Sequence, residues 1–424
     1  MAAAGHGARE GVGIAVREVS LPAGHPLLKA CWIAGGIGLV ALAAAFALGA
    51  AQEGGLGPRF WASYWTAWLW GVTVAVGGLF FVLLHHVTRA GWSVAVRRLA
   101  EHVAGTLPVF ALLALPALVA AGQLFPWLGG HGAEAAGHDP LLEHKQPFLN
   151  AGFFYLRSVL YLAAWSLLGW WFRRQSLRQD ATGDPRLTRR LQTFSAPGLV
   201  VFGVTLSFAA FDWVMSLDPH WYSTIFGVYL FAGSTVAILS LLILLGIVFE
   251  RRGPLAGVVT PEHYHDLGKL LFGFVVFWAY IGFSQFMLIW YGNIPEETVW
   301  YAHRLEHGWR NVTLALVLGH FVLPFLYLLS RDVKRRRPLI AGAAVWLLLV
   351  HYLDLYWLVM PAVSPAFDPA LSAAGAFAPH WLDLVTLVAV AGVALGAFGW
   401  LARGPALVPV ADPRLPESLS FENM

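Results

Sequence analysis

The chain has 424 residues, of which 58% are hydrophobic and only 12% charged, and its mean hydropathy is +0.64. Soluble domains carry about 25% charged residues, so this composition excludes an ordinary water-soluble protein and indicates a bilayer protein. The small formal net charge of +3 gives no case for nucleic-acid binding. Cys31 is the only cysteine, which excludes an intrachain disulfide, an iron–sulfur cluster held by this chain and a covalently attached c-type haem.

Long apolar runs divide the chain into ten predicted helices. A helix needs about 20 apolar residues to cross the hydrocarbon core, and the stretches that qualify are 27–51, 61–87, 103–125, 149–172, 196–217, 222–249, 267–291, 309–330, 338–360 and 380–402. The first is longer than a signal-peptide core of about 7–15 residues, so we expect a retained helix, although the small residues Ala47, Gly49 and Ala51 leave cleavage open. The predicted fold is an all-α integral membrane protein.

Outside this transmembrane domain of residues 27–402 lie an N-terminal segment, 1–26, and a tail, 403–424, which has four prolines and is expected to be extended.

Lys and Arg are distributed unequally between the connections. With the N-terminus inside, 22 of the 27 fall on the inner side, and the outer side receives Arg59, Lys145, Arg157, Arg304 and Arg310. The positive-inside rule therefore predicts that both termini are cytoplasmic.

The first of three longer outer connections, about 126–148, 292–308 and 361–379, carries three histidines, His131, His138 and His144. Their spacing is not compact, so we favour a solvated loop over a metal site.

The most distinctive motif, FDWVMSLDPHWYST, joins the helices at 196–217 and 222–249. It contains Phe211, Asp212, Trp213, Asp218, Pro219, His220, Trp221 and Tyr222. Proline after Asp218 disfavours helix there, which predicts a tight outer turn, with Trp213, Trp221 and Tyr222 as anchors at the membrane interface. Asp218 is better explained as a turn residue than as a chemical group. Asp212 lies inside the apolar helix, where an ionised carboxylate costs about 2.5–3.5 kcal/mol, so it should face a protein interior, a partner or water.

A second informative stretch covers residues 264–297. Asp266 is expected to cap the helix at 267–291 and to compensate Lys269 one turn later. Tyr280 and Ser284 follow helical spacing beside Gln285. Such a face suits bound water or a neighbouring helix.

These two stretches, continued by Pro295, Glu296 and Glu297, resemble the second polysulfide-reductase-type (NrfD-like) membrane subunit of bacterial alternative complex III. That complex is a quinol:cytochrome c oxidoreductase, in which the subunit is named quinone-binding subunit 2. The likeness covers most of the fifth to eighth helices by motif, and the remainder by length and helix count. It implies two four-helix bundles, made of helices 2–5 and 6–9 and flanked by helices 1 and 10, in the bacterial cytoplasmic membrane.

The resemblance also implies the partners, which are a sister NrfD-like subunit, pentahaem and monohaem cytochromes c and an iron–sulfur protein. Haems and iron–sulfur clusters would then belong to the partners, and this chain would hold no redox cofactor. Quinol oxidation is generally placed in the sister subunit. The resemblance therefore implies a chain that is not catalytic alone, with a proton pathway and quinone contact as hypotheses.

Ionisable and hydroxyl side chains inside the apolar helices suggest where a proton could move. Candidates in the middle or outer half of the membrane are Asp212, His320, His351, Asp354 and Asp383, and a line from the inner side is Lys269, Tyr280 and Ser284. A proton path needs such groups, or water, at hydrogen-bond spacing.

Each of these residues has a simpler explanation as well. His351 and Asp354 are three residues apart and share a helix face, and their proton role is weighed evenly against a structural one. For His320 we favour an interhelical hydrogen bond. Haem ligation by His320 and His351 is disfavoured, because two-haem b-type cytochromes show two such pairs. Arg157 is expected to snorkel to the interface.

Two alternatives stay open. A stand-alone proton-coupled secondary transporter usually shows Gly/Pro-broken helices at equivalent positions in two halves, and Pro108, Pro116 and Pro324 are not a clear match. A purely structural anchor for redox subunits would need none of the buried carboxylates for turnover.

Overall fold

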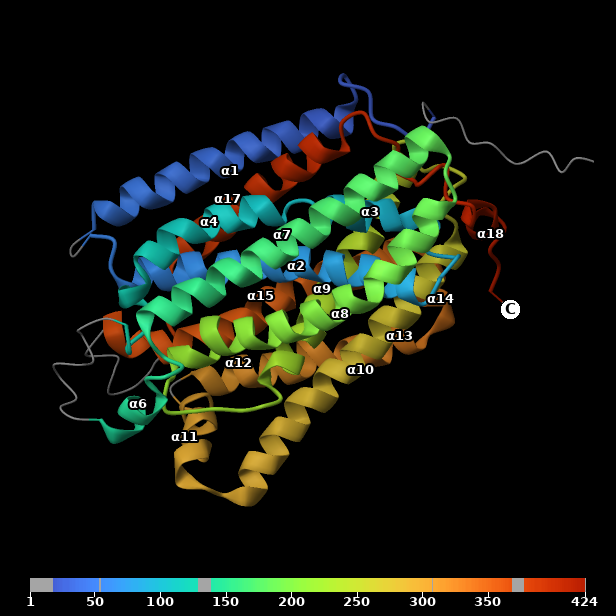
Figure 1. The fold of residues 1–424 in the computed structure, drawn as a ribbon. Helices are drawn as coiled ribbons and strands as arrows, with labels where there is room; N and C mark the ends of the chain where they lie inside the picture. The colour runs from blue at the N-terminus through green and yellow to red at the C-terminus, as the bar shows by residue number, and fades with distance from the viewer. Residues whose placement is uncertain (1–17, 53–54, 129–138, 307, 368–376, 424) are drawn as a thin grey trace, which may run out of the picture.

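The computed structural model describes residues 18–52, 55–128, 139–306, 308–367 and 377–423, and Figure 1 shows them as a set of helices running roughly side by side. Within these residues, ten helical spans are long and apolar enough to cross a membrane. They are Pro26–Ala50, Pro58–Val87, Val94–Val119, Ala151–Thr182, Arg186–Leu217, Phe226–Arg251, Pro261–Gly292, Trp309–Leu329, Arg337–Val363 and Trp381–Ala402. The predicted all-α integral membrane fold and its ten spans are confirmed.

In chain order the elements are α1 (Pro26–Ala50), α2 (Pro58–Val87), α3 (Val94–Ala104), α4 (Leu107–Val119), η1 (Ala121–Gln123), α6 (Pro140–Lys145), α7 (Ala151–Thr182), α8 (Arg186–Trp213), η2 (Met215–Leu217), α9 (Phe226–Arg251), α10 (Pro261–Gly292), α11 (Pro295–His303), α12 (Trp309–Leu316), η3 (Val317–Val322), α13 (Leu323–Leu329), α14 (Arg331–Arg335), α15 (Arg337–Phe367), α17 (Trp381–Ala402) and α18 (Leu415–Leu419). The segments η1 and η2 are short 3-10 turns, whereas η3 is a π-helical segment between α12 and α13.

The third span begins nine residues earlier than predicted, at Val94 instead of 103. Arg98 and Glu101 lie in this extra part, and they are fully buried and paired with each other through Arg98 Nε and Glu101 Oε2 at 2.8 Å. Their charges lower the hydropathy of a segment that is nevertheless inside the protein. The span is interrupted at residues 105–106, between α3 and α4, because Pro108 has no N–H to donate to the Ala104 carbonyl.

Helix α10 also begins earlier than predicted. Thr260 is its N-cap, and the Thr260 and His263 side chains form a reciprocal capping box. Asp266 therefore lies inside the helix, and the prediction that it caps the helix is wrong. Its ion pair with Lys269 is confirmed.

Helices α2 and α9 form the centre of the molecule and are the most buried spans. They pack against each other; α2 also contacts α3, α4, α8, α15 and α17, and α9 contacts α3, α8, α10 and α15. The division into bundles of helices 2–5 and 6–9 stays a prediction, because these two central helices contact members of both groups.

Helices α1 and α17 lie side by side at the edge of the molecule (Figure 1) and approach closely along small residues. A side chain on Gly38 would place its Cβ 2.5 Å from the Val393 nitrogen, and one on Gly35 would place it 3.0 Å from the Gly396 Cα. Only glycine allows two helix backbones to come so close, which is a common way for membrane helices to associate.

The two ends of the described chain lie at the same end of the molecule. The Gly404 nitrogen donates to Leu21 O at 3.3 Å, and the Leu407 nitrogen donates to Val19 O at 2.8 Å. We expected an extended tail; five of its residues form the helix α18, and Ser418 of α18 is buried. An even number of spans accounts for this placement.

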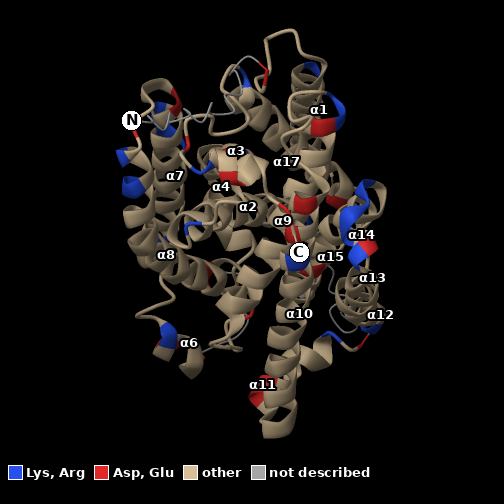
Figure 2. Ribbon diagram, turned by 90° about the vertical axis from the view of Figure 1, so that its right-hand side faces the viewer, with Lys and Arg blue, Asp and Glu red and all other residues tan. Residues whose placement is uncertain are grey.

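Several basic connections meet the tail at this end. Arg98 of α3 donates to Ala406 O at 3.1 Å, and Arg173 of α7 donates to Leu401 O at 2.7 Å. Figure 2 views this end and shows further Lys and Arg positions on α7 and α14. The basic segments assigned to one side by the charge bias are thus found together in space.

Candidate functional site

Asp354 is a buried carboxylate in the middle of α15. It accepts hydrogen bonds from the Tyr229 hydroxyl of α9 at 2.5 Å and from the Trp278 indole N–H of α10 at 3.1 Å. These two donors come from two different helices packed against α15. Asp354 therefore joins three spans through one polar site.

Two buried histidines complete this cluster. The His320 ring lies 3.9 Å from the Trp278 ring, and its Nδ1 is 4.0 Å from Asp354 Oδ2. His351 Nε2 lies 3.0 Å from the Thr73 hydroxyl of α2. We call Thr73, Tyr229, Trp278, His320, His351 and Asp354 the Asp354 cluster.

Local backbone structure brings these side chains together. His320 lies in the π-helical segment η3, a type of distortion that often occurs at functional sites. On the opposite side, Gly233 of α9 leaves room for His351, because a Cβ there would lie 3.1 Å from the His351 Cε1 atom. The same Cβ would lie 3.7 Å from Asp354 Oδ2, so His351 and Asp354 both face Gly233, as their predicted shared helix face requires.

Three imidazole nitrogens of the cluster are buried and have no hydrogen-bond partner among the described residues. They are both ring nitrogens of His320 and Nδ1 of His351. The hydrogen bond that we favoured for His320 is therefore not found. A group in this state can accept or release a proton without breaking an existing hydrogen bond.

Asp212 behaves differently from Asp354, because it has a cationic partner. Its carboxylate accepts from Arg157 Nε at 2.8 Å and Nη2 at 2.7 Å, and from the Tyr161 hydroxyl at 2.7 Å. Arg157 does not snorkel to the interface as we expected. It is buried and lies over the rings of Phe148 and Phe153, because pairing with Asp212 satisfies both charges inside the protein.

Asp383 is likewise neutralised within the structure. Arg59 Nη2 lies 2.5 Å from its Oδ2 atom, and the Ser63 hydroxyl donates to Oδ1 at 2.6 Å. Its carboxylate also accepts from the His380 nitrogen at the start of α17. Asp383 thus caps a helix and pairs with a cation, a structural role that explains its place in the membrane.

The line Lys269, Tyr280 and Ser284 is not brought to the Asp354 cluster. Lys269 pairs with Asp266 and donates to Asn423 of the tail at 2.8 Å. Tyr280 is 63% exposed on the outer surface of α10, and Ser284 is partly exposed. No hydrogen bond among the described residues connects these three side chains to one another.

The FDWVMSLDPHWYST motif turns at the predicted place, but its two tryptophans are not interfacial anchors. Trp213 is buried and donates to the Ser158 hydroxyl at 2.9 Å. Trp221 is buried and stacks on Trp300 with ring centroids 4.3 Å apart. Of the three residues predicted as anchors, Tyr222 alone is exposed. The two tryptophan rings fill the protein interior instead of facing lipid headgroups.

Other motif residues organise the end of the molecule that carries α6 and α11 (Figure 1). His220 Nε2 lies 2.7 Å from the carboxylate of Asp139, and this contact lowers the pKa of Asp139 below its ordinary value. Gln285 accepts from the Ser223 hydroxyl and donates to the Tyr301 hydroxyl. Pro295, Glu296 and Glu297 form the first turn of α11, where acidic side chains favour a helix N-terminus.

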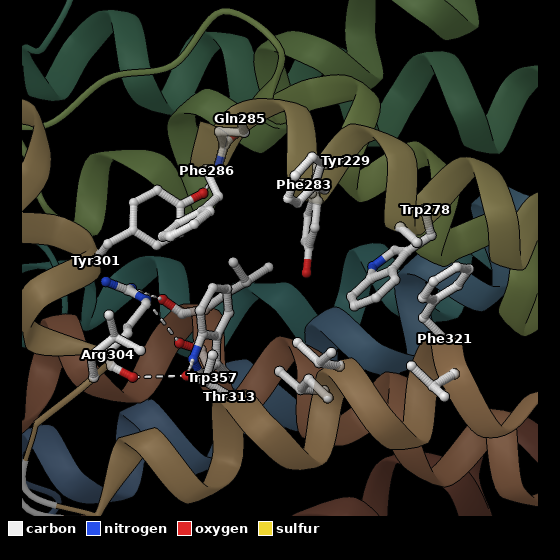
Figure 3. Close-up of a pocket in the computed structure, with 17 residues that line it drawn as sticks. Tyr229, Trp278, Phe283, Gln285, Phe286, Tyr301, Arg304, Thr313, Phe321 and Trp357 are labelled. Carbon is white, nitrogen blue, oxygen red and sulfur yellow. Dashed lines mark hydrogen bonds between the residues drawn. The ribbon is translucent and has the colours of Figure 1, made fainter. Parts of the chain in front are cut away.

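A cavity of about 460 Å³ lies beside the Asp354 cluster, between α10, α11, the α12–η3 segment and α15. Tyr229 and Trp278 line it and also donate to Asp354. Figure 3 shows the Tyr229 hydroxyl between a polar end, formed by Gln285, Tyr301 and Arg304, and an apolar end at Trp278 and Phe321. The cavity and the buried carboxylate therefore share two side chains.

The polar end of the cavity contains a buried cation. Arg304 donates to the backbone oxygens of Trp300, Trp357 and Leu358 and lies over the Trp300 ring. Burial lowers the pKa of Arg304 to about 9 and raises that of Tyr301 to about 12. At neutral pH Arg304 stays protonated and Tyr301 stays neutral.

Sequence reasoning missed Tyr229, Trp278 and Arg304 as members of this region. A tyrosine or tryptophan within an apolar run carries no charge signal, and Arg304 was counted only as an outer cation. To predict which polar groups face Asp354, one must know how each helix is rotated about its own axis. Hydropathy does not give this rotation.

Among the described residues, no group of three or more His, Cys, Asp and Glu side chains is arranged to hold a metal ion. His131 and His138 of the predicted outer loop lie outside the described residues, and His144 lies in α6. No protein-family model and no curated protein matches this chain.

Proposed function

We propose that this chain is a membrane subunit of a quinol-oxidising complex of the alternative complex III type, and that it moves protons through the Asp354 cluster. The motif resemblance supports the assignment to such a complex. The observation that supports the proton role is a carboxylate in the middle of a transmembrane helix with two hydrogen-bond donors, two nearby histidines and no cationic partner in the described structure.

The contrast with the other membrane carboxylates carries the argument. Asp212 has Arg157 and Asp383 has Arg59, so each can remain ionised as a stable ion pair. Asp354 has only neutral donors, and an uncompensated charge there would cost several kcal/mol. A carboxyl group in this position is suited to hold a proton and to release it only when a neighbouring group changes.

The histidines provide such neighbours. His320 Nδ1 is 4.0 Å from Asp354 Oδ2, a separation that a small side-chain rotation can close to hydrogen-bond distance. His351 continues the cluster toward Thr73 of α2. A proton could thus be shared between Asp354 and His320, and electron transfer in the partner subunits would alter the balance between them.

The proton role is tested in the purified complex, reconstituted into proteoliposomes with a pH-sensitive dye outside and a quinol as reductant. We expect Asp354→Asn to lower the number of protons released per electron while quinol oxidation continues. Asparagine retains an acceptor for Tyr229 and Trp278, so the fold should be preserved. Ser240→Ala on α9 is the matched control, because Ser240 is buried and its hydroxyl bonds only to Val236 O of its own helix.

An unchanged proton-to-electron ratio in Asp354→Asn would contradict the proton role and favour a structural anchor. Proton-coupled transport by the chain alone, purified without haem or iron–sulfur partners, would instead favour a stand-alone transporter. Co-purification of the native chain with multihaem and iron–sulfur proteins tests the assignment to the complex separately.

A further inference from the structure

The cavity beside the Asp354 cluster has an almost entirely apolar wall, because its polar groups already have partners in the protein. The Tyr229 hydroxyl donates to Asp354, and the Gln285 amide is shared between Ser223 and Tyr301. The Thr313 hydroxyl donates to Arg304 O and accepts from Trp357. What remains facing the space is mainly aromatic and aliphatic carbon, which suits a hydrocarbon chain better than a polar molecule.

The cavity opens on the lateral surface of the helices, which would face the lipid. Three of its lining residues are exposed there: Phe283 of α10 by 62%, Val317 of η3 by 48% and Leu305 by 44%. This rim is apolar and lies between two membrane-spanning segments. An occupant would therefore enter sideways from the bilayer, not from water.

Positive charge is found at only one end of this space. Arg304 precedes α12, at the outer end of the span, and only three of its five N–H donors are needed for its three carbonyl partners. Arg310 is exposed and lies one turn before the cavity-lining Thr313, on the same helix face. The deep end, at Trp278 and Phe321, has no charged residue in its lining.

We propose that this cavity is a binding site for an anionic phospholipid, with one acyl chain inside and the phosphate at Arg304 and Arg310. The gradient from cationic to apolar along the cavity matches that of a lipid whose headgroup lies at the outer interface. Burial of the Arg304 cation is costly, and a phosphate beside it offsets that cost. An acyl chain in the cavity also excludes water from Tyr229 and Trp278. Only the relevance of this exclusion to proton movement rests on the proposed function.

The site is tested by the lipid that remains bound after surface lipid has been exchanged for detergent. The full chain, in its native complex, is extracted in a mild detergent and washed, and the retained lipids are identified and counted by mass spectrometry. Ala279→Phe fills the cavity from α10. Gly273→Phe is the matched control, because Gly273 is exposed on the same helix with nothing within 4 Å of its Cβ position.

We expect Ala279→Phe to lower the retained anionic phospholipid by one molecule per chain and Gly273→Phe to leave it unchanged. Arg310→Gln should weaken retention of anionic lipid by about tenfold relative to zwitterionic lipid, the effect of one lost charge-assisted contact. Equal retention in both phenylalanine variants, or a stoichiometric quinone released in place of phospholipid, would overturn the inference. Asp354→Asn should retain the lipid, so loss of proton release with lipid still bound separates failure of the function from failure of this site.

Discussion

The ion pair between Arg157 and Asp212 makes a quantitative prediction about stability. Both side chains are buried, and two N–H donors of Arg157 meet the two oxygens of Asp212 at 2.8 and 2.7 Å. Removing one partner of a buried pair leaves an uncompensated charge and costs about 3–5 kcal/mol. We therefore expect Asp212→Asn and Arg157→Gln each to lower the free energy of unfolding by about 3–5 kcal/mol.

The double variant separates charge pairing from simple loss of packing. With both charges removed, neither is left buried alone, so the double variant should be no less stable than either single variant. The coupling energy between the two sites should then be at least about 3 kcal/mol, which is the upper end of values for contacting residues. Equilibrium unfolding in mixed micelles, followed by far-UV circular dichroism, measures all four proteins.

Glu296→Gln, which removes an exposed charge at the start of α11, is the control and should change stability by less than about 0.5 kcal/mol. Single variants that unfold like the wild type would refute the buried ion pair. Destabilisations that simply add in the double variant would refute the coupling.

Three further predictions concern other parts of the molecule. Gly38→Val should push α1 away from α17, at a cost of about 1–3 kcal/mol, and should make maleimide labelling of Cys31 faster; an unchanged labelling rate would contradict the close helix contact. Ser418→Val removes the hydroxyl that bonds to Trp92 O, the Ala95 nitrogen and His263. The free energy of tail packing against the helices should fall by about 1–3 kcal/mol, so trypsin should remove the tail sooner than in the wild type. Asp139 has a pKa below its ordinary 3.8 because His220 hydrogen-bonds its carboxylate; its stabilisation of α6 is therefore complete above pH 3.8 and is lost as pH falls through the lowered pKa. Amide exchange in α6 should show this loss in the wild type and not in Asp139→Asn.

The positions of the helices could be predicted from the sequence, because a membrane span is defined by its local composition. Each of the ten apolar runs corresponds to a helical span. Errors in the boundaries occurred where buried charge interrupts hydropathy, as at Arg98 and Glu101 in α3, or where capping residues extend a helix, as at Thr260.

The partners of the buried polar residues could not be predicted in the same way. Arg157 and Asp212 are 55 positions apart, and Tyr229 and Asp354 are 125 apart. Whether such residues meet depends on the rotation and tilt of each helix. The π-helical segment at His320 adds a further local rotation that hydropathy does not indicate. The sequence therefore predicted which residues are unusual, but not which of them already have a counter-charge.

The most direct test of the account is whether the carboxyl group of Asp354 changes its protonation during turnover. Infrared difference spectroscopy of the reconstituted complex, recorded between the quinol-reduced and oxidised states, detects the C=O stretch of a protonated carboxyl group. We predict a difference band in that region that is present in the wild type and in Ser240→Ala and absent from Asp354→Asn. A band of the same size in Asp354→Asn, or no carboxyl band in the wild type, would contradict a proton-carrying role for this residue.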